Sequence, residues 1–161
     1  MKLFINGLKT ILFGLFFIYL WAWASFQFKY FDKYVYINFP KWFIIPGYIL
    51  ITAGGLIAFA TAMTFVIIGK GTPAPFDSPR EFVSTGLYKY VRNPMYIGGF
   101  LLFEGYAFLN LSFSMMIFPL FWLIIVHLFI VFYEEKTLEK KFGQSYKNYK
   151  NKVNRWIPKL Y

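Results

Sequence analysis

The sequence predicts an all-α integral membrane protein with about four transmembrane helices and a C-terminal amphipathic helix. Its 161 residues are 58% hydrophobic, and the mean hydropathy is +0.50. Only 15% are charged, well below the roughly 25% typical of soluble domains. The charges gather in short segments between long uncharged runs, a pattern typical of a chain that crosses a bilayer several times.

The composition also excludes several kinds of site. A chain without cysteine has no disulfide and no thiolate nucleophile, and a single histidine excludes a multi-histidine metal site within one chain. The net charge of +10 is shared by nucleic-acid binders, but anionic membrane lipids explain it more simply. We therefore expect membrane lipids as partners, no nucleic acid and no metal.

The first predicted helix is the uncharged run of residues 10–28, which is about the length that crosses a bilayer. A secretory signal peptide is the competing interpretation. Lys2 and Lys9 precede the apolar run, and Ala22-Trp23-Ala24 is similar to a cleavage site. We favour a retained first helix.

The second predicted helix covers residues 42–69 and is long enough to tilt in the bilayer. Its small residues Ala53-Gly54-Gly55 would let a neighbouring helix come close. Residues 71–92 then form the main loop, because the prolines of Thr72-Pro73-Ala74-Pro75 prevent a regular helix. Ser78-Pro79-Arg80-Glu81 is similar to the start of a short helix.

Residues 95–133 are too long for one crossing, and Asn110-Leu111-Ser112-Phe113-Ser114 offers a break between two antiparallel helices. The ionisable residues in this stretch are Glu104 and His127. A carboxylate inside a membrane helix is costly and usually faces a partner or a wet cavity, so Glu104 is a functional candidate. For His127 we favour a polar contact between helices over a role as a base.

Residues 134–161 form a basic tail. Leu138, Phe142, Tyr149 and Val153 recur at helical spacing, which predicts an amphipathic helix that lies on the membrane or caps the bundle. Four crossings place the amino terminus, the main loop and the tail on the side richer in lysine and arginine. By the positive-inside rule this side is cytoplasmic, and we expect the cell inner membrane.

We expect one membrane domain over residues 1–161. Residues 1–69 would supply the first two transmembrane helices. Residues 70–161 would supply a core with the loop, the helical hairpin and the basic tail.

Candidate binding residues occur at two places, before the first and after the second of the two antiparallel helices in residues 95–133. A hairpin of these helices would bring both places to the same side of the membrane. In Arg92-Asn93-Pro94-Met95-Tyr96, arginine can bind a carboxylate with two hydrogen bonds and asparagine can both donate and accept. Gly98 exposes backbone where a ligand or a helix must approach closely. Glu134-Glu135 follows the second helix of the hairpin. If that helix ends there, its macrodipole disfavours the carboxylates and hints at a function, whereas a continuing helix would favour pairing with arginine.

The same stretches carry a resemblance to a known family. From Gly69 to its end, the chain resembles the membrane methyltransferases that include isoprenylcysteine carboxyl methyltransferases and phosphatidylethanolamine N-methyltransferases. The segments that carry this resemblance are Gly69-Lys70-Gly71-Thr72-Pro73-Ala74-Pro75, Gly86-Leu87-Tyr88, Val91-Arg92-Asn93-Pro94-Met95-Tyr96-Ile97-Gly98, Glu134-Glu135, Phe142-Gly143-Gln144-Ser145-Tyr146 and Arg155-Trp156-Ile157-Pro158.

The resemblance implies S-adenosylmethionine as the methyl donor, with a lipidic or hydrophobic acceptor that arrives from the bilayer. It also implies a set of residues around the donor. These are Arg92, Asn93, Pro94, Tyr96, Gly98, Glu134 and Glu135.

The resemblance leaves two kinds of acceptor open. Prenylcysteine enzymes have histidine where this chain has Asn93, so this motif is more similar to that of the phospholipid amine methyltransferases, whereas the tail is more similar to the prenylcysteine branch. A carboxylate acceptor would need a cation such as Arg155 or Arg80. An amine acceptor would need a base such as Glu104 or Glu135.

Two other classes remain alternatives. Membrane sterol and steroid reductases end in a similar helical region but bind NADPH, and this chain is short for them. A non-catalytic membrane adaptor is the third class, although polar residues gathered at one surface argue against it.

Overall fold

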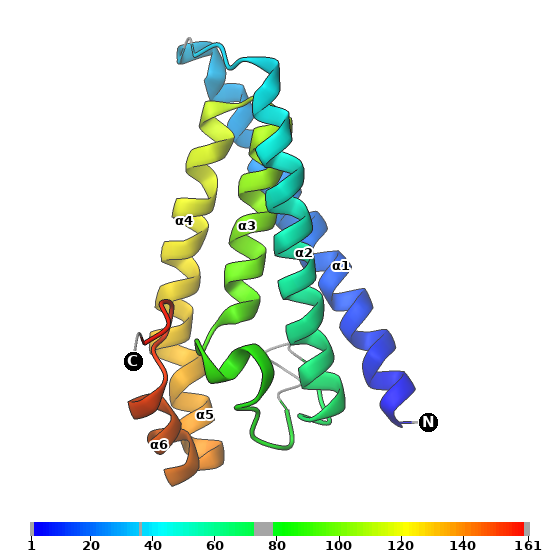
Figure 1. The fold of residues 1–161 in the computed structure, drawn as a ribbon, viewed down its shortest axis with the longest axis vertical. Helices are drawn as coiled ribbons and strands as arrows, with labels where there is room; N and C mark the ends of the chain where they lie inside the picture. The colour runs from blue at the N-terminus through cyan, green and yellow to red at the C-terminus, as the bar shows by residue number, and fades with distance from the viewer. Residues whose placement is uncertain (1, 36, 73–78, 160–161) are drawn as a thin grey trace.

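The structure is a bundle of long helices that is narrow at one end and broad at the other (Figure 1). This computed structural model describes residues 2–35, 37–72 and 79–159, of which the side chains of residues 2 and 3 are not described. The described residues are 79% helical and include no strand. Both ends of the chain and the loop after the second long helix lie at the broad end (Figure 1).

The predicted crossings are present as helices. The long helices of the bundle are α1 (Lys2–Phe28), α2 (Ile44–Ile67), α3 (Pro94–Leu109) and α4 (Phe113–Phe129). Three stretches of the described chain are long and apolar enough to span a membrane, namely Phe4–Tyr34, Lys41–Ile67 and Phe113–Phe142. The 16 residues of α3 form a shorter helix, which packs against both α2 and α4. These features confirm an all-α integral membrane protein with about four transmembrane helices.

Glycines allow α2 and α3 to touch backbone to backbone. A Cβ atom on Gly54 of α2 would lie 2.6 Å from the carbonyl oxygen of Gly98 on α3. Further along the same two helices, a Cβ on Gly105 of α3 would lie 2.7 Å from the carbonyl oxygen of Gly47 on α2. Small residues at such contacts are how membrane helices approach closely, which agrees with the prediction for the second helix.

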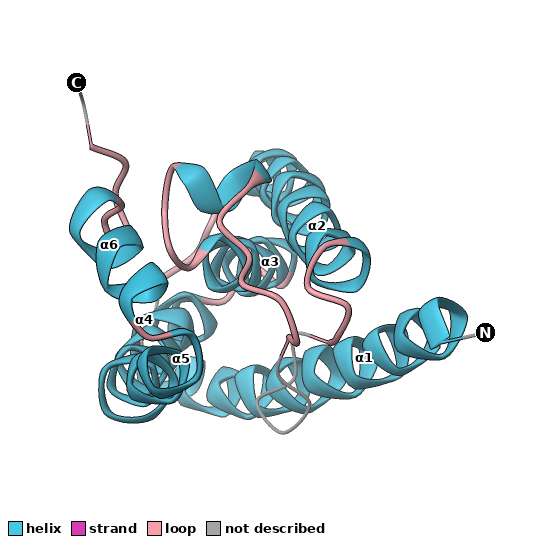
Figure 2. Ribbon diagram, turned by 90° about the horizontal axis from the view of Figure 1, so that it is seen from below, coloured by secondary structure: helices cyan, strands magenta, loops and turns pink. Residues whose placement is uncertain are grey.

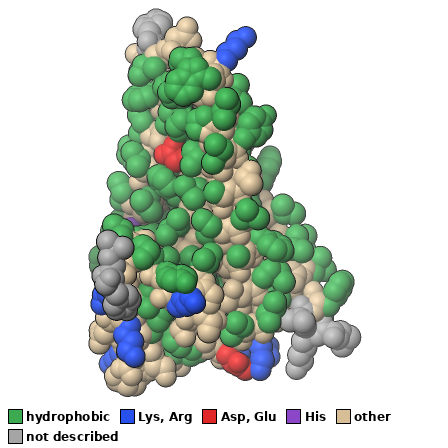
Figure 3. Space-filling model, viewed as in Figure 1, with side chains coloured by type: hydrophobic (Ala, Val, Ile, Leu, Met, Phe, Trp, Pro, Cys, Tyr) green, Lys and Arg blue, Asp and Glu red, His purple; other side chains and the backbone are tan. Residues whose placement is uncertain are grey.

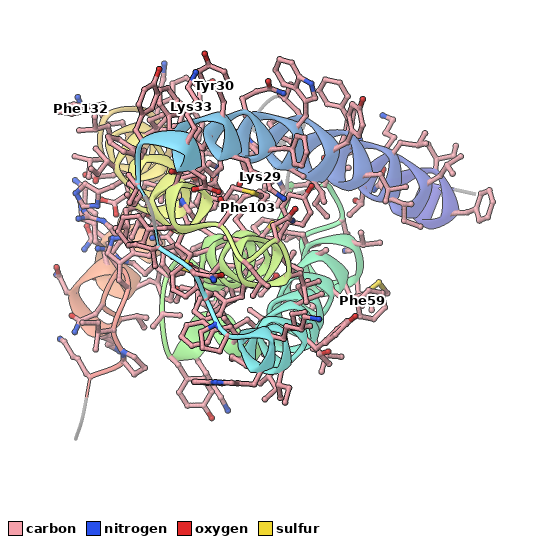
Figure 4. All side chains as sticks on the ribbon, turned by 90° about the horizontal axis from the view of Figure 1, so that it is seen from above. Lys29, Tyr30, Lys33, Phe59, Phe103 and Phe132 are labelled. Atoms are coloured by element: carbon pink, nitrogen blue, oxygen red, sulfur yellow. The ribbon has the colours of Figure 1, made fainter. Side chains whose placement is uncertain are left out.

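Polar side chains join the helices at the narrow end. The turn Lys29–Tyr34 (η1) follows α1, and there Asp32 Oδ1 accepts a hydrogen bond of 3.0 Å from the backbone N–H of Ser114. Lys29 Nζ donates to Asn110 Oδ1 at 3.2 Å. These contacts tie α1 to the α3–α4 connection. Figure 4, seen from above, also shows Lys33 beside Tyr30, with Nζ 3.5 Å from the ring centroid.

An aromatic core holds α1, α3 and α4 together. Phe103, Phe118 and Trp122 are buried with Val126 and Ile130, and Phe103 points into the bundle in Figure 4. By contrast, Phe59 of α2 and Phe132 point outward in the same view and are 67% and 64% exposed. Exposed apolar side chains on these helices fit a surface that faces lipid.

The loop after α2 differs in part from the prediction. Residues 73–78, which include the prolines Pro73 and Pro75 and the predicted helix cap Ser78, lie outside the described residues. Residues 79–85 are not helical, so the short helix predicted from Ser78 is wrong over this part. Instead, the helical turn is Gly86–Lys89 (η3).

The tail also differs from the prediction of one amphipathic helix. After α4 the helix continues through a wider π turn, Ile130–Glu134 (η4), into α5 (Glu135–Phe142). Gly143 then breaks the helix with φ of +56°, a conformation that suits glycine, and α6 (Gln144–Lys152) follows. The helix therefore does not end at Glu134-Glu135, and the macrodipole argument for a function of this pair no longer applies.

Charge is distributed unevenly along the bundle. Lys and Arg side chains gather at the broad end in the face that Figure 3 shows, and hydrophobic side chains cover most of the rest. The broad end also carries the main loop and the tail, as the sequence pattern predicts.

Candidate functional site

A cavity of about 640 Å³, open solvent at its mouth included, lies at the broad end of the bundle. Figure 2 views this end from below and shows the loop after α2 running across the lower ends of α2 and α3. The walls come from α2, this loop, the first turn of α3, the π turn, α5 and α6. The residues that line it are Phe65, Pro79, Phe82, Val83, Tyr88, Arg92, Asn93, Met95, Tyr96, Ile130, Glu134, Glu135, Leu138, Phe142, Tyr146 and Tyr149.

The entrance of α3 is fixed from both sides. Pro94 is its first residue, where proline costs no hydrogen bond because that N–H has no partner inside the helix. Just before it, Val91 pairs with Asn154 of the tail in an isolated parallel bridge, and Arg92 N donates to the Asn154 carbonyl at 2.9 Å. The backbone therefore holds the side chains of Arg92, Asn93 and Tyr96 against the cavity.

Glu134 is a carboxylate at the cavity without a described cationic partner. Its Oε2 accepts a hydrogen bond of 2.8 Å from the Tyr96 hydroxyl, and no ion pair joins it to a described lysine or arginine. The π turn ends at this residue. Such turns are frequent at functional sites, and here the turn accompanies two successive carboxylates, Glu134 and Glu135, on the wall of one cavity.

Glu135 differs from its neighbour because two arginines surround it. Arg155 donates from Nε to Oε1 at 2.8 Å and from Nη2 to Oε2 at 3.1 Å. Arg92 Nη1 lies 3.0 Å from the same Oε1 as an ion pair. That contact is an ion pair without a hydrogen bond, and Arg92 Nε and Nη1 are buried without a hydrogen-bond partner among the described residues. The geometry thus leaves Arg92 with unused donors at the cavity.

Buried and half-buried aromatic side chains form much of the remaining wall. The ring of Phe82 lies edge-on to the rings of Tyr146 and Tyr149, with centroids 5.9 and 5.2 Å away. Burial raises the pKa of Tyr88, Tyr146 and Tyr149 above the usual value of 10.0. These hydroxyls are therefore neutral over the physiological range, and the aromatic faces suit an apolar or cationic ligand.

The tail closes over the same elements. Asn93 Nδ2 donates to the Arg155 carbonyl at 3.3 Å. Further along, Trp156 Nε1 donates to His127 Nδ1 at 3.1 Å, and the indole ring packs against the aromatic core. His127 therefore makes the polar contact that the sequence favours, although its partner belongs to the tail and not to another long helix.

The structure brings together only some of the predicted site residues. Arg92, Asn93, Tyr96, Glu134 and Glu135 line the cavity. Two other predicted donor residues support the fold around it, because Pro94 begins α3 and Gly98 packs against α2.

Of the residues predicted to meet the acceptor, Glu135 lines the cavity, but Arg155, Arg80 and Glu104 do not. The side chain of Arg155 is bound to Glu135. Arg80 is exposed, and its backbone N–H donates to the Gly69 carbonyl. Glu104 lies further along α3, about 12 Å from Tyr96 along the helix axis.

The sequence does not predict the aromatic lining of the cavity. Aromatic residues are 25% of this chain, so composition does not distinguish the lining residues Phe65, Phe82, Tyr146 and Tyr149 from those that face lipid or the core. The tail does contain one signal. Phe142, Tyr146 and Tyr149 recur at helical spacing among lysines.

Comparison with known proteins gives one family. A family model described as phospholipid methyltransferase matches residues 42–145, which is more than half of the chain and extends from the turn before α2 to the start of α6. The curated proteins and the solved structures contain no match to the chain.

Proposed function

Since the chain belongs to the phospholipid methyltransferase family, we propose that this membrane methyltransferase transfers a methyl group from S-adenosylmethionine to a lipidic amine. The observation that carries the proposal is the pair of unlike charges left available at the cavity. Glu134 has no described cationic partner, and Arg92 has buried donors without hydrogen bonds. The donor has a sulfonium, an ammonium and a carboxylate, so a wall with both charges suits it.

The binding roles follow from this arrangement. Glu134, oriented by the Tyr96 hydroxyl, would attract a cationic group of the donor. Arg92 would bind the donor carboxylate, because a guanidinium can donate to two oxygens and its Nε and Nη1 make no hydrogen bond to a described residue. Asn93 and the aromatic rings would complete the enclosure.

For methyl transfer the protein mainly has to align the acceptor with the methyl group of the donor. S-adenosylmethionine supplies a methyl group on a positively charged sulfur, which is already an activated electrophile. The residues of the cavity would align the acceptor with that group, and their apolar rings would exclude water. No protein nucleophile is needed.

The geometry favours an amine over a carboxylate as acceptor. A carboxylate needs a cation, but the guanidinium of Arg155 is already bound by both oxygens of Glu135, and Arg80 is exposed away from the lining. An amine attacks as the neutral base and becomes a cationic ammonium when it gains the methyl group. Aromatic faces and an available carboxylate stabilise such a cation.

We further propose that the broad end faces the cytoplasm, where a water-soluble donor would enter. Basic side chains gather there (Figure 3), and the positive-inside rule assigns such an end to the cytoplasm. The acceptor would arrive through the bilayer, and for a chain of this kind we expect the cell inner membrane.

The test is a transfer assay with the detergent-purified protein returned to vesicles. Labelled S-adenosylmethionine is supplied with vesicles that contain phosphatidylethanolamine or, separately, a prenylcysteine analogue. The proposal predicts labelled lipid with one added methyl group on nitrogen. Label in the prenylcysteine ester alone would refute the amine acceptor, and label in neither, from protein that binds the donor, would refute both lipid classes.

A variant in the cavity and a matched control outside it test whether the transfer depends on Glu134. Glu134→Gln should lose most of the transfer, because it removes the free carboxylate and keeps the shape of the side chain. Glu81→Gln changes an exposed carboxylate paired with Lys70, outside the cavity, and should transfer at the wild-type rate. Equal rates in both variants would contradict the role of Glu134.

A further inference from the structure

Arg155 lies outside the cavity but reaches a residue that lines it. It belongs to residues 154–156, which we name the tail clasp. The clasp is bound to the rest of the molecule at each residue. Asn154 accepts from Arg92 N, Arg155 accepts from Asn93 Nδ2, and Trp156 donates to His127.

Two arginines compete for one carboxylate at this place. Glu135 is 8% exposed, and its side chain and that of Arg92 are each 10% exposed. Arg155 takes both oxygens of Glu135 with good hydrogen-bond geometry, whereas Arg92 only approaches one of them. A planar guanidinium normally binds a carboxylate through two parallel hydrogen bonds, and here Arg155 occupies that arrangement.

This competition explains the unusual state of Arg92. A buried guanidinium with unused donors is costly, so in the absence of another partner it would pair with the nearest carboxylate. The nearest carboxylate is Glu135, which Arg92 approaches through Nη1 but whose two oxygens Arg155 already binds. Nε and Nη1 of Arg92 therefore make no hydrogen bond to a described residue.

We propose that Arg155 is a positioning residue that binds both oxygens of Glu135 and so leaves the unused hydrogen-bond donors of Arg92 to an anionic group of the ligand. The proposal rests on the proposed function, from which it takes the carboxylate of the donor as that group. Without Arg155, Glu135 would bind Arg92 with both oxygens and close the anion subsite. The sequence assigned Arg155 to the acceptor, and here it acts instead through Glu135.

A single and a double variant distinguish a positioning role of Arg155 from a merely structural one. Arg155→Gln should weaken donor binding about tenfold, the low end of the range found when a residue that orients a metal ligand is lost. Adding Glu135→Gln should restore it to near the wild-type value, because no carboxylate then remains to bind Arg92. A merely structural role predicts the opposite, since a second change in the same buried cluster would weaken binding further.

The experiment is calorimetric titration of the detergent-purified full chain with S-adenosylmethionine and with its decarboxylated analogue. Arg155→Gln should lose affinity for the complete donor and much less for the analogue, which has no carboxylate for Arg92. Lys152→Gln, an exposed cation of the same tail, is the matched control and should bind as the wild type does. Unchanged binding in Arg155→Gln, an equal loss for both ligands, or no rescue in the double variant would overturn the proposal.

A second readout needs no donor, so it separates this proposal from the proposed function. Phenylglyoxal reacts faster with a guanidinium whose N–H groups are not all held by hydrogen bonds, and peptide mass mapping measures its reaction at Arg92. Labelling of Arg92 should fall in Arg155→Gln and return in the double variant. If the wild-type chain binds no S-adenosylmethionine, the proposed function fails, and the labelling alone decides whether Arg155 limits the pairing of Arg92 with Glu135. Equal labelling in all three proteins would refute it.

Discussion

Adding one methyl group to Gly54 should separate the two helices that hold the cavity. The new Cβ would lie 2.6 Å from the Gly98 carbonyl oxygen and 2.8 Å from the backbone N of Leu102. Ordinary contacts begin at 3.4 Å, so α3 must move by about 0.8 Å or distort. Both atoms belong to the backbone and cannot rotate away. Overpacking of this kind costs about 2–3 kcal/mol in a well-packed interior.

The adjacent glycine provides the control for Gly54→Ala. A Cβ on Gly55 would meet its nearest atom, Cδ2 of Leu102, at 4.0 Å. Gly55→Ala should therefore leave stability unchanged or raise it by up to about 1 kcal/mol through helix propensity. Thermal unfolding in detergent, followed by tryptophan fluorescence, measures both variants. Gly54→Ala should lower the midpoint by roughly 5–10 °C. An equal shift in the two variants would refute the backbone contact as the cause.

Three further perturbations have defined outcomes. Tyr96→Phe removes the hydrogen bond to Glu134 and should weaken donor binding about tenfold, as expected for a bond to a charged group, whereas Tyr90→Phe at the exposed surface should not change it. Asp32→Asn weakens a charged cap on the first turn of α4 and should lower the free energy of unfolding by about 1 kcal/mol in a denaturant titration. The third is pH. Burial raises the pKa of Tyr146 in the folded chain above its usual 10.0, so the unfolded chain releases this proton first. Stability should be complete below pH 10 and fall as the pH rises further, and Tyr146→Phe should show a smaller fall.

Much of the membrane architecture can be predicted from the sequence because it follows from local properties. The length and apolarity of each run predict the helices, and Asn110 with its neighbours predicts the break between α3 and α4. Gly54 was recognised as a point of close approach for the same reason, since small residues have that effect in any membrane helix. The gathering of cations at the broad end also follows from simple counting along the chain.

The tail could not be predicted in the same way because long-range contacts decide it. The spacing of Leu138 and Phe142 indicates helix, but only Gly143 shows where it breaks, and glycine has many roles. The return of residues 154–156 to the entrance of α3 depends on pairing with Arg92 and on the contact of Trp156 with His127. No local pattern specifies such pairings.

The candidate site was predictable by resemblance more than by physical pattern. The resemblance pointed to Arg92, Asn93, Tyr96, Glu134 and Glu135, all of which line one cavity. The resemblance does not show that Glu135 is paired with arginine whereas Glu134 has no described cationic partner. That difference depends on which carboxylate an arginine from the tail reaches, and only the folded structure provides it.

The most direct test of the account is equilibrium binding of S-adenosylmethionine to the detergent-purified protein, with NADPH measured in parallel. We expect the wild-type chain to bind S-adenosylmethionine and not NADPH. Glu134→Gln should weaken this binding about tenfold or more, since a charged partner is lost from a buried wall, while Glu81→Gln should not. Unchanged affinity in Glu134→Gln, or binding of NADPH alone, would contradict the proposed donor site.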